Sequence, residues 1–109
     1  MLTERDLIMR LVRQLAEVLA AVLQLRRQGK REEALARIDQ VTGRFTGMDA
    51  GPLCLFGGPA LASVPGEMRL PLARLLRARA HILRASGDLA GFHQALRAAL
   101  QLVRSAPPS

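Results

Sequence analysis

Residues 26–38 read RRQGKREEALARI, and residues 84–96 read RASGDLAGFHQAL, so one pattern occurs twice in the chain. In each stretch a run of helix-forming residues ends at a glycine, Gly29 or Gly87, and a short polar step leads into a second apolar helical pattern. Glycine readily adopts the left-handed backbone conformation that commonly ends a helix. Each stretch therefore predicts a turn between two antiparallel helices.

The helices on either side of these turns can be bounded from capping residues and apolar periodicity. Thr3 can cap the first helix, with Asp6 in its first turn, and Asp88 can cap the last one. We expect helices at about residues 4–28, 31–44, 70–86 and 89–104, followed by a frayed tail at 105–109.

Each expected helix has an apolar stripe that predicts its buried face. The stripe of the first helix covers roughly half of its circumference, more than one antiparallel neighbour can cover. We therefore expect the middle of the chain and a second copy of the protein to share this face. The expected homodimer contacts are Leu7, Leu11, Val18, Leu19 and Leu23. The expected inward stripe of the last helix is Leu89, Phe92, Leu96, Ala99 and Val103.

Residues 46–67, TGMDAGPLCLFGGPALASVPGE, separate the two helical pairs. Repeated Gly and Pro exclude a long helix, so we expect a long apolar loop with one short helical turn at Pro59–Ser63. Its leucines are too apolar for a free linker, and we expect them to lie against the first helix. The third helix should then begin near Leu70, with Pro71 in its first turn.

Composition favours a single all-α domain over residues 1–109. Half of the residues are hydrophobic, but Trp and Tyr are absent and only three Phe occur, which suits helix packing better than a β-sheet. The lone Cys54 cannot form an internal disulfide. Charges in MLTERDLIMR interrupt any signal-peptide core, and no uncharged stretch predicts a membrane span. We expect a cytoplasmic protein.

The two helical pairs resemble the tetratricopeptide repeat, a helix-turn-helix unit of about 34 residues. Gly29 matches Gly87 and Leu25 matches Leu83 at the same offset. The Trp and Tyr of the motif are missing, and Phe92 replaces a small residue at the close helix contact. The segments DLIMRLVRQLAEVLAAVLQLRRQGKREEAL and LRASGDL are similar to a family of short bacterial tetratricopeptide-like proteins of unknown function. That resemblance implies two helical hairpins and supplies no activity.

Catalytic or metal-binding chemistry needs converging His, Cys, Asp or Glu side chains. His81 and His93 fall on different expected helices and have no acidic neighbour at helical spacing. Adjacent Glu32 and Glu33 suit a solvated helix start, and Cys54 suits a packed small hydrophobe. We therefore expect no enzyme activity, no metal and no cofactor.

The net charge of +7 lies mainly in the C-terminal part, where residues 69–109 hold seven Arg and one acid. Arg74, Arg77, His81 and Arg84 follow spacings of three, four and three, so they share about 80° of one helix face. We call these four residues the arginine stripe. The resemblance implies that such positions line a peptide-binding groove, to which the first pair would add Arg26 and mainly apolar residues.

A groove with an arginine side and an apolar side suits an acidic, partly apolar peptide. We therefore expect a protein-interaction or scaffold module. A solvated helix face in an arginine-rich composition is the plainer interpretation of the same residues. Nucleic-acid binding by the basic C-terminal pair is the alternative function, although stacking aromatics and groove-reading motifs are lacking.

Arg79 falls inside the apolar arc of the third expected helix. A buried, unpaired guanidinium is costly. We therefore expect Arg79 to pair with Glu17, Asp39 or Glu67, or to reach water at a subunit interface.

Overall fold

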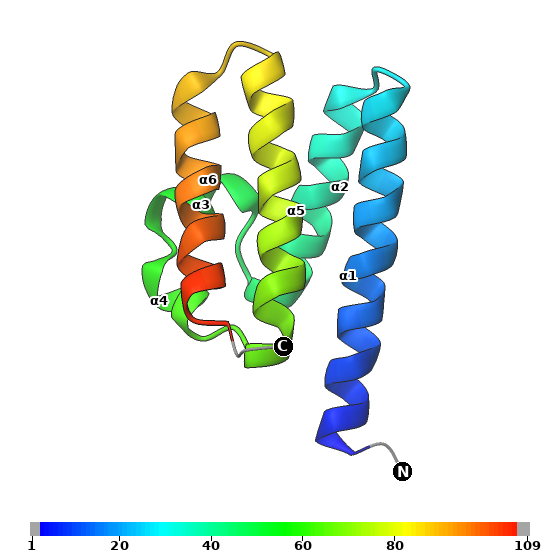
Figure 1. Ribbon diagram of the computed structural model, residues 1–109, viewed down its shortest axis with the longest axis vertical. Helices are drawn as coiled ribbons and strands as arrows, with labels where there is room; N and C mark the ends of the chain where they lie inside the picture. The colour runs from blue at the N-terminus through cyan, green and yellow to red at the C-terminus, as the bar shows by residue number, and fades with distance from the viewer. Residues whose placement is uncertain (1–2, 107–109) are drawn as a thin grey trace.

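The computed structural model describes residues 3–106, and this part of the chain is entirely helical apart from turns (Figure 1). The all-α prediction is therefore confirmed. The described part forms six helices: α1 (Glu4–Arg27), α2 (Arg31–Thr46), α3 (Ala50–Phe56), α4 (Gly58–Ala62), α5 (Gly66–Ala85) and α6 (Leu89–Arg104). The expected bounds of the first and last helices agree with α1 and α6 to within one residue.

Helix α5 lies at the centre of the structure. It contacts α6 on one side and α1 and α2 on the other (Figure 1). Its leucines at 72, 75 and 76 are at most 1% exposed, because neighbours cover almost its whole circumference. The remaining core comes from single faces of the other helices, including Leu15 and Val22 of α1. Burying this apolar surface is the main force that holds the helices together.

The two glycine turns have the same geometry. Gly29 has a φ of +74° and Gly87 a φ of +85°, as expected for helix-ending glycines. After the first glycine, the N–H of Lys30 donates to the carbonyl of Leu25 at 2.9 Å, and the equivalent bond after Gly87 has the same length. These bonds satisfy carbonyls that the helix end would leave unpaired. The two similar stretches thus end α1 and α5 in the same way.

The predicted caps are confirmed. The hydroxyl of Thr3 accepts a hydrogen bond from the N–H of Asp6, and the N–H of Thr3 donates to the Asp6 carboxylate. Asp88 accepts from the N–H of Gly91 at 2.9 Å at the start of α6. Reciprocal bonds of this kind fix the first turn of a helix, because its N–H groups have no partners within the helix.

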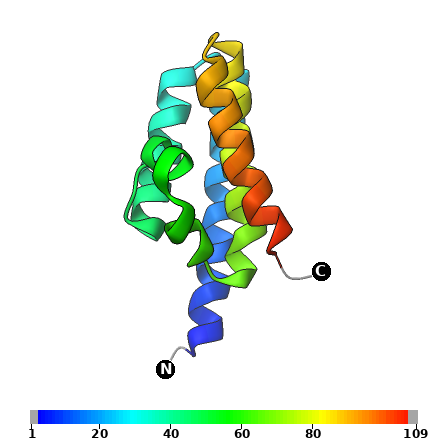
Figure 2. The ribbon, with the colours of Figure 1, turned by 90° about the vertical axis from the view of Figure 1, so that its left-hand side faces the viewer.

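The structure corrects the predicted loop over residues 46–67. Two short helices form there, and the turn expected at Pro59–Ser63 is α4. Proline is tolerated in a first turn, so Pro52 and Pro59 limit helix length without preventing helices. The break between α3 and α4 requires Gly57, because a Cβ there would collide with the carbonyl of Leu53. These helices pack mainly against α6 and α2, and not on α1 as expected (Figure 2).

Helix α5 begins at Gly66, four residues before the expected start, so Pro71 lies inside the helix. The early start is explained by Arg69, which is only 7% exposed. Its guanidinium donates to the carbonyls of Ala62 and Val64 and to the hydroxyl of Ser105. One side chain thus ties the end of α4 to the end of α6 and holds the first turn of α5 in place.

The buried face of α6 differs from the expected stripe. It consists of small residues and one leucine: Gly91, Ala95, Ala98, Ala99 and Leu102. Leu89 and Val103, expected inside, are 59% and 47% exposed. Small side chains let α6 pack closely against its neighbours, and the larger apolar side chains are left outside the core.

The molecule measures 45 × 27 × 25 Å, and the N-terminal end of α1 extends beyond the other helices (Figure 1). Within residues 3–106, none of the helices combines the length and the apolar run needed to cross a bilayer.

Of the tail expected to fray, Ser105 caps α6 and accepts a hydrogen bond from Arg69. Residues 107–109 lie outside the described part.

We predict that Arg69→Met lowers the free energy of unfolding by about 2–4 kcal/mol, because it removes three hydrogen bonds and leaves the buried Val64 carbonyl without a partner. Urea titration followed by far-ultraviolet circular dichroism would measure the loss, since the chain has no Trp or Tyr. Arg97→Met, at an exposed position of α6, is the control. Equal losses in both variants would contradict the role of the Arg69 contacts.

We predict that Gly87→Ala destabilises the protein by about 1 kcal/mol, because an alanine is strained at this positive φ. Gly58→Ala is the matched control: a Cβ there meets no atom within 4 Å, and φ lies outside the positive region. The same urea titration compares the two variants. A Gly87→Ala protein as stable as the control would show that the turn does not need glycine.

Candidate functional site

The strongest candidate site is a groove of about 570 Å³ between α5 and α6. Both helices line it along their lengths, in antiparallel directions. We call it the α5–α6 groove, and its lining consists of Leu70, Ala73, Arg74, Arg77, His81, Phe92, Leu96, Ala99, Leu100 and Val103.

The two sides of the groove differ in chemistry. The α5 side carries Arg74, Arg77 and His81, three of the four residues of the arginine stripe. The α6 side is apolar, and Leu100 and Val103 are each nearly half exposed there. The groove therefore presents cationic hydrogen-bond donors opposite an apolar wall.

Positive charge gathers at the His81 end of the groove. Burial lowers the pKa of His81, and the charges of Arg26, Arg77 and Arg84 lower it further. Arg26 comes from α1, so a third helix adds its charge to this end of the groove. The guanidinium carbon of Arg84 lies 5.4 Å from the ring centre of Phe92, a distance at which a cation is attracted to an aromatic face.

Three of the five predicted partner-binding residues, Arg74, Arg77 and His81, line this groove. Arg84 contacts the ring of Phe92, which also lines it, whereas Arg26 lines a separate pocket with Leu23 and reaches His81 only through its charge. The apolar part of the site was expected from α1, but α6 supplies it. The sequence did carry a signal for this: the alanines at 95, 98 and 99 already form a second apolar stripe on α6. A close contact through that stripe leaves Phe92, Leu96, Leu100 and Val103 facing the groove.

The predicted homodimer residues of α1 lie in different surroundings. Leu11, Val18 and Leu19 are partly buried against the core of their own chain. Leu7, near the N-terminal end of α1, is 47% exposed. Leu23 lines a shallow pocket beside Arg26. Of these five leucine and valine residues, Leu7 is the most exposed in the isolated chain.

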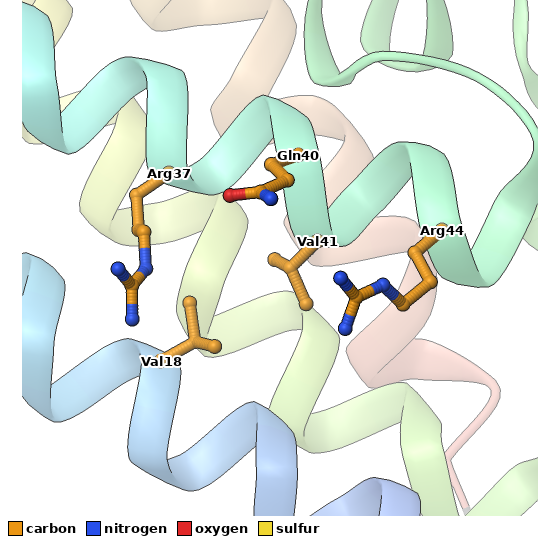
Figure 3. Close-up of a pocket in the computed structure, with 5 residues that line it drawn as sticks. All are labelled: Val18, Arg37, Gln40, Val41 and Arg44. Atoms are coloured by element: carbon orange, nitrogen blue, oxygen red, sulfur yellow. The ribbon is translucent and has the colours of Figure 1, made fainter.

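A smaller cleft of about 240 Å³ lies between α1 and α2 (Figure 3). Arg37 and Arg44 extend from α2 on either side of Val41, and Gln40 lies between them on the same helix. Val18 of α1 faces them across the cleft. The two guanidinium groups make this a second basic surface, with less apolar area than the α5–α6 groove.

Within residues 3–106, Arg79 does not have the carboxylate partner that the sequence led us to expect. Its Nε atom is buried and has no hydrogen-bond partner in this part of the chain. Asp39 instead accepts a hydrogen bond from the N–H of Ala50, at the start of α3. The guanidinium lies near Gly51, where an added Cβ would be 3.4 Å from Nη2. Helix α3 thus occupies the place where a loop was expected, and its first N–H group bonds Asp39, one of the expected partners of Arg79.

Cys54 lies close to Arg79 but is not an activated thiol. Burial raises the pKa of Cys54, and this outweighs the opposing effect of the Arg79 charge. A nucleophilic cysteine needs a lowered pKa.

Within residues 3–106 no group of three or more His, Cys, Asp or Glu side chains is arranged to hold a metal. Comparisons with family models, curated proteins and solved structures find no match to this chain.

We predict that His81 titrates below the ordinary value of 6.5, because burial and three neighbouring arginines disfavour its charged form. Replacing Arg77 or Arg84 by Gln should raise the pKa of His81, and Arg97→Gln on α6 should leave it unchanged. NMR titration of the ring protons would measure all four proteins. Since the unfolded chain would bind this proton more readily, the contribution of His81 to stability declines as pH falls below 6.5. A pKa of His81 at or above 6.5 would contradict the predicted effect of burial and of the neighbouring arginines.

Proposed function

We propose that this protein is a non-catalytic protein-interaction module that binds an acidic, partly apolar segment of a partner protein in the α5–α6 groove. One observation carries the proposal: Arg74 and Arg77 line one wall of a groove whose other wall is apolar. Guanidinium groups form paired hydrogen bonds with carboxylates, and an apolar wall favours desolvated side chains. The two walls together favour a ligand that has both features.

The size of the groove and the field around it support this assignment. A volume of about 570 Å³ lies within the range of roughly 300–1,000 Å³ that is common for ligand sites. Burial is the main cause of the lowered pKa of His81, and the charges of Arg26, Arg77 and Arg84 add to it, so positive charge gathers at one end of the groove. Half-exposed Leu100 and Val103 would lose contact with water on binding, and this burial favours association.

We also propose a cytoplasmic location and a tetratricopeptide-like relationship between the α1–α2 and α5–α6 pairs, like that of the short bacterial family of unknown function. The matching turns at Gly29 and Gly87 support it. A homodimer remains part of this proposal. It would use the extended end of α1, where Leu7 and Met9 are 47% and 45% exposed.

Nucleic-acid binding is the second candidate function. It is favoured by the cleft between α1 and α2, where Arg37 and Arg44 could contact phosphates in addition to the arginine stripe. Binding of this type would weaken steeply with salt and would need no apolar wall. The apolar side of the α5–α6 groove therefore favours the protein partner.

We predict that an acidic, leucine-containing peptide binds the wild-type protein and that Arg74→Glu/Arg77→Glu weakens binding by about tenfold or more, because two charge-assisted contacts become repulsive. Fluorescence anisotropy at near-physiological salt would measure the affinity. Arg37→Glu/Arg44→Glu is the matched control, since it changes net charge equally in the other cleft.

Equal losses in the two double variants would indicate that general charge, and not the α5–α6 groove, attracts the peptide. Tight and salt-sensitive binding of a DNA or RNA duplex, with no peptide binding, would replace this proposal with the second candidate.

A further inference from the structure

The α5–α6 groove has the length of a short helix. Its lining runs from Leu70 to His81 on α5 and from Phe92 to Val103 on α6. Each run advances by eleven residues, or about 16 Å along a helix axis, which equals about three helical turns. Because α5 and α6 are antiparallel neighbours, the groove follows both axes and is open to a third helix laid along it.

The floor of the groove permits close approach. Ala73 and Ala99 lie in its lining and are 2% and 5% exposed. The larger side chains of Leu70, Leu96 and Leu100 line it as well. Helices pack when the ridges of one enter the groove of another, at axis separations of about 8–10 Å. Small residues with larger neighbours provide a surface of this kind.

An extended peptide suits this site less well than a helix. The backbone groups of α5 and α6 are paired within their own helices, so they offer no edge for strand addition. An extended chain placed against the apolar α6 wall would lose water from its own N–H and C=O groups without replacement. A helix pairs these groups internally and can present apolar side chains to the same wall.

The charges of the α5 wall define a spacing for the partner. Arg74 and Arg77 lie three residues apart and therefore nearly one turn apart on the same face. Carboxylates three or four residues apart on a neighbouring helix would match them. His81 lies one further turn along α5, and the charges of Arg26 and Arg84 act on it. A third carboxylate on the partner helix is therefore favoured at this turn.

We propose that the α5–α6 groove binds an amphipathic helix of about three turns from an acidic partner protein, with its apolar face on Leu96, Leu100 and Val103 and its carboxylates on Arg74 and Arg77. This inference rests on the proposed function and specifies the form of the ligand. Charge complementarity and the two-sided lining select this occupant over a second copy of the chain, whose net charge of +7 would oppose approach to an arginine wall.

The test uses three designed peptides of equal composition, each with one Trp. The first places Glu at positions i, i+4 and i+7 beside a leucine stripe. The second has the same residues in an order that gives no amphipathic face. The first peptide also carries a Pro after its helical segment. In the third peptide this Pro changes places with a central Ala, so that the composition is kept and a continuous helix is prevented. Because the protein has no Trp, the fluorescence of the peptide reports binding directly.

We expect the first peptide to bind at least about tenfold more tightly than the other two, because only it can bury an apolar face with its backbone satisfied. Circular dichroism should show helix formation on binding. Leu100→Gln should weaken binding by about five- to tenfold through the loss of apolar contact. Leu89→Gln is the matched control, since Leu89 is exposed on the same helix outside the groove.

The possible failures are distinguishable. If all three peptides bind equally and Arg74→Glu/Arg77→Glu abolishes binding, the helix inference is wrong and the proposed function stands. If none binds, both are wrong. A different outcome of sedimentation is a wild-type dimer that the Leu100→Gln substitution dissociates and that the first peptide fails to dissociate. In that case the groove is a contact between copies, and the helical partner is excluded.

Discussion

The burial of α5 on nearly all sides is the constraint on which the rest of the structure depends. A helix that is apolar around most of its circumference must be covered by several neighbours, and α1, α2 and α6 fill those positions. The arginine stripe occupies the remaining part of α5, because its charges cannot be buried without partners. The same helix thus supplies the core of the protein and the cationic wall of the candidate site.

The contact of α6 with its neighbours through small residues has a consequence for function. Alanines at 95, 98 and 99 bring α6 close to the core, and each larger apolar residue on the adjacent face is displaced toward the surface. Exposed leucine and valine contribute nothing to folding while water covers them, so their placement beside Arg74 and Arg77 favours a role in binding. Exposed apolar side chains and clustered positive charges both lower the stability of a folded protein, and here they lie on the same surface.

Buried Arg69 and half-buried Arg79 show how differently one kind of side chain can be accommodated. Arg69 donates to the carbonyls of Ala62 and Val64 and to Ser105, so its polar atoms are satisfied where the chain ends of α4 and α6 meet. Arg79, beside α3, has a buried Nε that finds no hydrogen-bond partner among residues 3–106. Arg69 lies at the end of α4, where free backbone carbonyls accept its hydrogen bonds, and Arg79 lies beside α3, where no such carbonyl accepts from its Nε. The segment between the two helical pairs therefore determines whether each guanidinium finds hydrogen-bond partners.

Local signals in the sequence determined the four long helices, the caps at Thr3 and Asp88 and the two glycine turns, because glycine, capping side chains and apolar spacing act within a few residues. They also determined that Arg74, Arg77, His81 and Arg84 share one face of a helix. Tertiary structure alone decided which of two apolar stripes of α6 is buried, where α3 and α4 pack, and how far α5 extends before Pro71. These outcomes depend on contacts between residues distant in the chain, and Arg69 with Ser105 is the clearest of them. The acidic or basic character of a face can therefore be foreseen from spacing, whereas the wall that completes a groove depends on which helix packs beside it.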